Sequence, residues 1–107
     1  MEKIVVFSES VENYLEQLIE TLFEKEYFGF KIDAKNYVRK IIYYTENHTF
    51  ENGVYETSTK YSDFGKYYIR YKANQHTFWY IFFDKKENHV LINHIFNNHD
   101  HDFPELI

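Results

Sequence analysis

The chain has no cysteine, and its 107 residues include only three glycines and one proline. Without cysteine there is no disulfide, no thiolate nucleophile and no cysteine-based zinc site, and this composition fits a reducing compartment. So few glycines and prolines leave little room for disordered linkers, and the length suits one hydrophobic core. We therefore expect a single domain over residues 1–107.

Long apolar runs and an excess of basic residues are also missing. No run approaches the ~20 apolar residues that a membrane helix requires, and the opening MEKIVVFSES lacks the regions of a signal peptide. We expect a cytoplasmic protein that makes no membrane contact. The formal charge of −5 argues against nucleic-acid backbone as the main partner, because that affinity comes from Lys and Arg. An acidic total still permits a local basic site.

Aromatic residues are abundant, with 11 Tyr and 11 Phe. Many of them fall in three runs that are rich in β-branched and aromatic residues, Lys66–Lys72, Thr77–Asp84 and His89–Asn97. Short polar breaks separate these runs, as in hairpins. The middle run is apolar at every position of Phe78–Phe83, so both of its faces must be covered. We expect it to be the central strand of an antiparallel meander.

The first half of the chain predicts one strand and two helices. Lys3–Phe7 is short and β-branched, as in a strand. Apolar residues then recur at three- and four-residue spacing, which predicts an amphipathic helix from an N-cap at Ser8 to about Glu26. We expect Asp33 to cap a second helix that ends near Asn47.

The segment His48–Phe64 is open to two interpretations, a small hairpin turning at Asn52-Gly53 or a surface loop. The order of elements is then strand, helix, helix, loop and three strands. This order predicts an α+β fold, in which an N-terminal strand joins the sheet and a two-helix hairpin packs on an antiparallel β-meander.

The stretches KIVVFSESVENYLEQLIETL, YYIRYKANQHTFWYIFF and HVLINHIFNNHDHDFPEL together resemble the RelE/ParE superfamily, the toxins of bacterial type II toxin–antitoxin (plasmid stabilisation) systems. The resemblance spans nearly the whole chain and rests on pattern, not on an invariant motif. It implies a partner antitoxin whose C-terminal segment wraps the toxin. RelE-like members are mRNA interferases that cut mRNA on the ribosome, whereas ParE-like members poison DNA gyrase and have no hydrolytic site.

Carried over residue by residue, the resemblance gives five candidate site residues and no cofactor. Arg70 occupies the strand position where the family commonly has a functional arginine, which would stabilise the attacked phosphate. His99 or His94 would transfer protons, with His76 and Tyr80 in support. At the other positions where the family has basic residues, this sequence has few. The turn has Thr77 where ribonuclease members have arginine, and NNHDHD replaces the basic residues at the end of the last strand.

Each candidate also has a plain structural alternative. Arg70 can be a surface arginine stacked on neighbouring tyrosines, and the histidines can belong to a solvated tail. The group His94, His99 and 100–102 offers imidazole and carboxylate, but its spacing matches no standard metal site, so we expect no metal. Phe78–Phe83 lacks interleaved basic residues, which favours core over base stacking.

We therefore expect the toxin half of a toxin–antitoxin pair, with mRNA endonuclease activity that is weakened or absent. The alternative is a non-enzymatic interaction protein of the same fold, either gyrase-directed or a degenerate toxin, which acts through a protein partner. Trp79, if partly exposed, would anchor the antitoxin or a second copy in a homodimer. A coincidental α+β domain is a third interpretation, and the sequence leaves open whether the protein is an enzyme.

Overall fold

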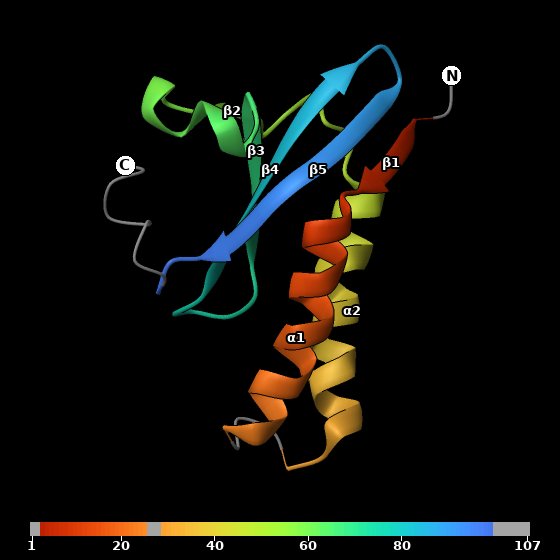
Figure 1. Ribbon diagram of the computed structural model, residues 1–107, viewed down its shortest axis with the longest axis vertical. Helices are drawn as coiled ribbons and strands as arrows, with labels where there is room; N and C mark the ends of the chain where they lie inside the picture. Colours follow the sequence, from red (N-terminus) through yellow and green to blue (C-terminus); the bar gives the residue numbers. More distant parts are fainter. Residues whose placement is uncertain (1–2, 26–28, 100–107) are drawn as a thin grey trace.

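The computed structural model describes residues 3–25 and 29–99. It is an α+β fold built on one five-stranded mixed sheet (Figure 1). The elements in chain order are β1 (Ile4–Phe7), α1 (Glu9–Glu24), α2 (Lys31–Asn47), β2 (Tyr55–Glu56), the 3₁₀ helix η1 (Thr59–Phe64), β3 (Tyr67–Lys72), β4 (Phe78–Lys86) and β5 (His89–Asn97). No helix within the described residues is long and apolar enough to span a membrane.

The strands lie in the order β1-β5-β4-β3-β2. β1 runs parallel to β5, and every other pairing is antiparallel. β3, β4 and β5 form the expected meander, with β4 at its centre. The N-terminal strand joins the sheet at its edge, as predicted.

The first helix follows its prediction closely. The Ser8 hydroxyl accepts a 3.3 Å hydrogen bond from the Val11 amide, which is the N-cap interaction expected for that residue. The carboxylates of Glu9 and Glu12 lie in the first turn, where the helix dipole favours them. The helix ends at Glu24, close to the predicted end.

The predicted start of the second helix is wrong. Its N-cap is Phe30, without a side-chain capping bond, and Asp33 lies inside the first turn. An aspartate is favourable both at the cap and in the first turn, because the exposed amides and the helix dipole attract it in either place. The residue type alone therefore does not fix the first residue. The helix ends at Asn47, as predicted.

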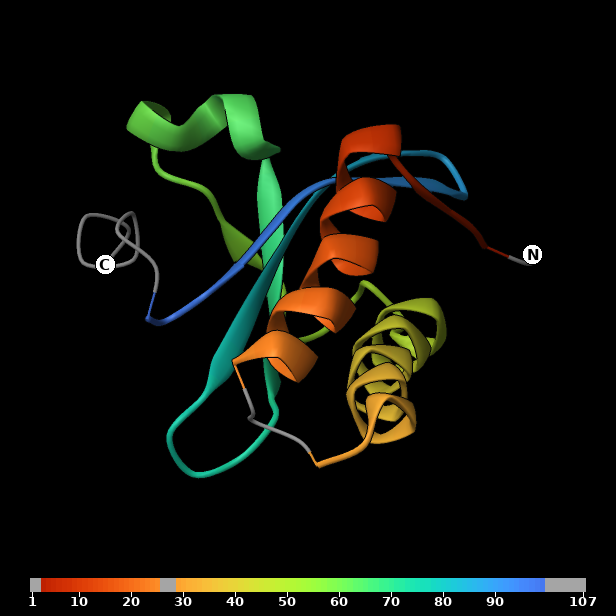
Figure 2. The same ribbon diagram turned by 60° about the horizontal axis from the view of Figure 1, so that its bottom comes forward.

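The two faces of β4 are covered by different elements. Figure 2 shows α1 and α2 on one side of the sheet and η1 on the other. The helix-side core includes Trp79, Ile81 and Phe83, together with apolar residues of both helices. The opposite face carries a second cluster, which we call the aromatic cluster. Its buried members are Tyr61, Tyr80, Phe82 and Phe96, and Phe64, Tyr68 and Phe78 pack against them.

Trp79 is one of the most buried side chains, with 1% of its surface exposed. Its indole N–H donates a 2.9 Å hydrogen bond to the Tyr37 hydroxyl on α2. The anchoring role for an antitoxin or a second copy required a partly exposed Trp79, and that condition is not met. A tryptophan in the central strand contributes its large apolar area to the core, and its one polar atom is satisfied by a helix.

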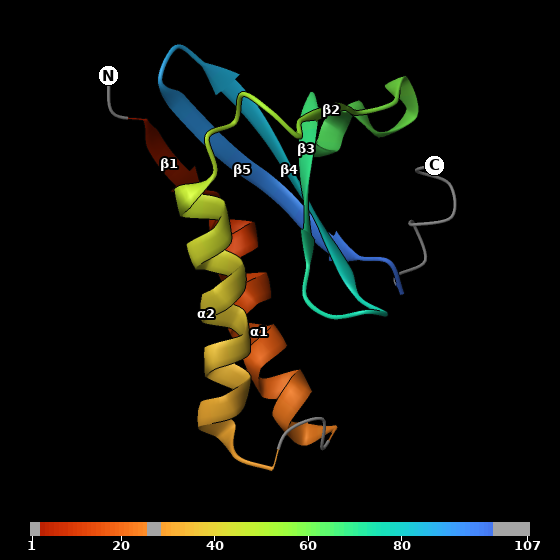
Figure 3. The same cartoon turned by 180° about the vertical axis from the view of Figure 1, so that it is seen from behind.

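The segment between α2 and β3 contains a very short strand followed by η1, and this strand pairs with β3, not across a turn at Asn52-Gly53. β2 has two residues, and its last pairing with β3 is Tyr55 opposite Tyr68. Beyond this pair the outer edge of β3, from Ile69 to Lys72, has no strand beside it among the described residues. Figure 3, the view from behind, shows β3 and α2 both turned toward the viewer. The shortness of β2 thus exposes one stretch of strand edge.

Candidate functional site

The structure divides the five predicted site residues into two groups. Arg70, Tyr80 and His94 lie on the face of the sheet opposite the helices. Arg70 on β3 is directly opposite Tyr80 on β4, and Tyr80 is opposite Phe96, two residues along β5 from His94. His76 and His99 lie beyond the strand ends.

Tyr80 and His94 belong to the packing of the aromatic cluster. Only 6% of the Tyr80 surface is exposed, and burial raises the pKa of its hydroxyl above the usual 10.0, with the charge of Arg70 offsetting part of the rise. The His94 ring stacks on Phe64, with ring centroids 4.0 Å apart and planes 12° from parallel. With Tyr80 buried and His94 half-buried against Phe64, the two side chains are poorly placed to reach a substrate.

His76 and His99 come together at the turn between β3 and β4. The Asn98 side chain accepts a 3.0 Å hydrogen bond from the Phe78 amide and donates a 3.1 Å bond to the His76 carbonyl. The Nε2 atom of His99 lies 3.3 Å from the Thr77 hydroxyl. A row of residues, Lys72, Phe78 and Asn98, separates this corner from Arg70 and Tyr80. The sheet therefore does not gather the candidates at one point.

The described residues contain no group of three or more His, Asp or Glu side chains close enough to hold a metal ion. His94 and His99 fall within that part of the chain. The remaining members of the sequence-based group, Asp100, His101 and Asp102, lie outside the described residues.

Arg70 is the candidate with the most accessible chemistry. Its guanidinium lies over the Tyr55 ring, 4.4 Å from the centroid, and Nη2 donates to the Tyr55 hydroxyl. This is the tyrosine stacking foreseen as the structural alternative. The side chain is exposed, and no carboxylate of the described residues forms an ion pair with it. A guanidinium has several N–H donors, so stacking on Tyr55 leaves donors for an anion.

A pocket of about 460 Å³ opens beside Arg70 at the exposed edge of β3, and we call it the edge pocket. It holds two cations and no acidic side chain. Its lining residues are Tyr44, His48, Gly53, Tyr55, Arg70, Lys72 and Phe78. Such a combination of positive charge and aromatic rings suits an anion that carries a flat ring.

His48 contributes a neutral imidazole to the edge pocket. Burial lowers its pKa below the usual 6.5, and the charge of Lys3 lowers that pKa further. Its Nδ1 accepts a 2.8 Å hydrogen bond from the Phe50 amide. Because Nδ1 is the acceptor, the proton of the neutral ring is on Nε2. His48 therefore offers the pocket an N–H donor.

Comparison of the chain with protein-family models, curated proteins and solved structures finds no match.

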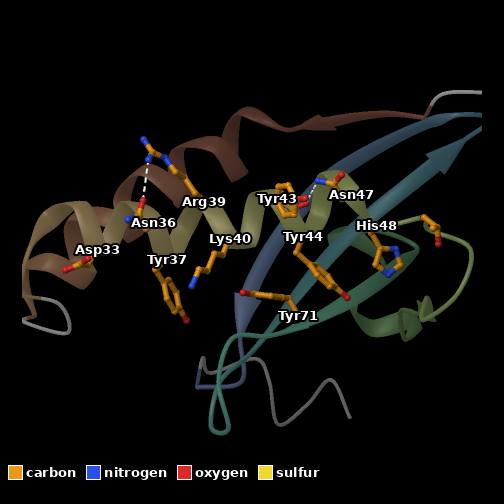
Figure 4. Close-up of a pocket in the computed structure, with 11 residues that line it drawn as sticks. Asp33, Asn36, Tyr37, Arg39, Lys40, Tyr43, Tyr44, Asn47, His48 and Tyr71 are labelled. Carbon is orange, nitrogen blue, oxygen red and sulfur yellow. Dashed lines mark hydrogen bonds between the residues drawn. The ribbon is translucent and has the colours of Figure 1, made fainter.

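A second, larger hollow of about 1090 Å³ follows α2, and we call it the helix groove. It shares Tyr44 and His48 with the edge pocket, so the two hollows adjoin. In Figure 4, Tyr37, Lys40 and Tyr44 point from α2 toward the side on which Tyr71 of β3 lies. The full lining is Asp33, Asn36, Tyr37, Arg39, Lys40, Tyr43, Tyr44, Asn47, His48, Thr49 and Tyr71.

No role was predicted from the sequence for Tyr44, His48 or Tyr55. A signal for Tyr44 was present, because YVRKIIYY places three tyrosines and two basic residues within eight positions of a predicted helix. Tyr55 gave no such signal, since its position depends on a two-residue strand in a segment whose structure the sequence left open.

Proposed function

We propose that this protein is the toxin of a bacterial type II toxin–antitoxin pair with a RelE/ParE-like fold, and that it acts on RNA through Arg70. It would work in the cytoplasm and be silenced by its antitoxin. The observation that carries the proposal is the exposed Arg70 guanidinium, which is fixed by Tyr55 and has no carboxylate partner among the described residues.

The chemistry of Arg70 suits a phosphodiester. A guanidinium can donate two parallel hydrogen bonds to phosphate oxygens, and its charge favours the extra negative charge that develops when a 2′-hydroxyl attacks the phosphorus. Tyr55 supports the side chain, and the Tyr44 hydroxyl binds the Arg70 carbonyl at 2.6 Å. Both ends of the residue are thus held in place, which reduces the cost of ordering it around a ligand.

Cleavage also needs a base and an acid near the same phosphate. The histidines are divided between the aromatic cluster and the corner at His99, so we expect slow cleavage or none. This division favours the second candidate, a protein of the same fold that acts through a protein partner such as gyrase and performs no chemistry.

Induced expression in a bacterial host tests the proposal. We expect wild-type protein to arrest growth and Arg70→Gln to relieve the arrest, while Lys85→Gln, which removes an exposed charge on β4, still arrests it. Circular dichroism of purified Arg70→Gln establishes that it is folded. Mapping of mRNA 5′ ends then separates the candidates, because cleavage that depends on Arg70 supports the RNA target, and arrest with intact mRNA supports the protein partner. Absence of arrest by well-expressed wild-type protein would overturn the toxin assignment.

A further inference from the structure

The helix groove reverses the charge balance of the molecule. The whole chain has 17 acidic and 12 basic residues, yet the groove is lined by Arg39 and Lys40 against one acid, Asp33. The adjoining edge pocket adds Arg70 and Lys72 and no acid. Four basic residues therefore line two adjoining hollows of an acidic protein, which makes this region complementary to a polyanion.

Aromatic rings line the groove together with these cations. Tyr44 and Tyr71 form a tilted pair with centroids 4.9 Å apart, and Tyr44 also contacts the His48 ring. Tyr43 stands out from α2 with 69% of its surface exposed. An aromatic side chain this exposed offers a free face to a flat ligand, and nucleic-acid bases stack on such faces with little regard to sequence.

The hydroxyls of Tyr37 and Tyr44 in the groove stay protonated at neutral pH. Burial raises the pKa of both Tyr37 and Tyr44, so these groups add no negative charge that would repel a phosphate. The groove follows α2 from Asp33 to Asn47, a length of about 20 Å, which accommodates several nucleotides of an extended strand.

We propose that the helix groove binds single-stranded nucleic acid, with bases stacked on Tyr43 and on the Tyr44–Tyr71 pair and a phosphate held by Lys40. The bound nucleic acid continues into the edge pocket, where Arg70 contacts a further phosphate. The path of the nucleic acid past Arg70 rests on the proposed function. Its contacts along α2 are independent of that function. A duplex is disfavoured, because its bases are stacked on one another and present no free faces to the tyrosines.

Fluorescence anisotropy tests this with a labelled oligouridine RNA of about 12 nucleotides, within the range of common single-strand site sizes. We expect Tyr43→Ala to weaken binding by about fivefold or more, and Tyr43→Phe, which keeps the ring, to bind like wild type. Lys40→Gln should weaken binding and lower the salt dependence by about 0.7 in the logarithmic slope, as for one lost phosphate contact. Lys35→Gln is the matched control, since Lys35 is an exposed lysine of α2 that does not line the groove.

The outcomes separate this inference from the proposed function. If Arg70→Gln weakens binding and the groove variants do not, the proposal that the helix groove binds nucleic acid is overturned, and the role of Arg70 stands. If only the groove variants weaken binding, the groove stands and the Arg70 contact fails. Equal loss with Lys35→Gln, equal binding of a duplex of the same length, or displacement of the RNA by a polyglutamate peptide at similar concentration would each overturn the single-strand assignment.

Discussion

The hydroxyl of Tyr44 on α2 donates a 2.6 Å hydrogen bond to the backbone carbonyl of Arg70 on β3. The two residues are 26 positions apart in the chain, so this contact fixes the helix against the strand edge at the point where the edge pocket meets the helix groove. Because Tyr44 lines both hollows, its position sets how they join.

Tyr44→Phe removes this hydrogen bond and keeps the ring. We expect the free energy of unfolding to fall by about 0.5–1.5 kcal/mol, the usual net contribution of such a bond, measured by urea denaturation. Tyr43→Phe is the control, because the Tyr43 ring is largely exposed and no hydrogen bond of its hydroxyl links it to the described residues. Equal losses in the two variants would show that the Tyr44–Arg70 bond has no special role.

His48 predicts a loss of stability in mild acid. The unfolded chain takes up a proton as the pH falls through the usual pKa of 6.5, while the folded protein resists it because burial holds the pKa of His48 lower. The contribution to stability is therefore present above pH 6.5 and is lost as the pH falls toward the folded-state pKa.

His48→Asn supplies the matched variant, because an amide oxygen can replace Nδ1 as acceptor for the Phe50 amide but does not titrate. We expect its urea midpoint to decline less between neutral and mildly acid pH than that of wild type. Parallel declines would mean that the protonation of other groups causes the acid sensitivity.

Tyr80 predicts a loss of stability in alkali. Burial raises the pKa of its hydroxyl above 10.0, so above that pH the unfolded chain ionises while the folded protein keeps the phenol neutral. Stability is full below pH 10 and falls as the pH rises through the folded-state pKa. We expect Tyr80→Phe to reduce this alkaline decline. Thermal melts on either side of pH 10 measure it. An unchanged decline would assign it to other tyrosines.

Gly65 lies close to the backbone of β4. Its φ is 143°, and a Cβ at this position would lie 2.8 Å from the Phe83 amide nitrogen. Gly65→Ala therefore combines backbone strain with a clash against a central strand, and we expect a loss of at least about 1–3 kcal/mol in urea denaturation. Gly29→Ala is the control, since nothing lies within 4 Å of its Cβ position. Similar losses in the two variants would contradict the close-approach argument.

The sequence predicted the elements whose periodicity is strong. The predicted run His89–Asn97 has the same bounds as β5, and α2 ends at Asn47 as predicted. Both agree because alternating and helical apolar patterns directly reflect which side chains are buried. Asp33 was misplaced because its residue type suits two neighbouring positions of a helix start. β2 and η1 stayed open because their pairing and packing depend on tertiary contacts with β3 and the aromatic cluster.

Of the five candidate residues named from the sequence, only Arg70 lines the edge pocket. The burial of Tyr80 and the stacking of His94 on Phe64 arise from η1, whose packing over the sheet was not visible in the sequence. The groove residues Tyr44 and Tyr71 come from a helix and a strand that meet only in the folded chain. The RelE/ParE assignment itself stays a prediction.

The shortness of β2 has a consequence for solubility. An uncovered strand edge is a template on which another chain can add a strand and begin to aggregate. Here Tyr44 occupies one carbonyl of that edge, and the charged side chains of Arg70 and Lys72 stand beside it. The two cations thus act as gatekeepers against edge-to-edge association, and neutralising both at once would be expected to promote self-association.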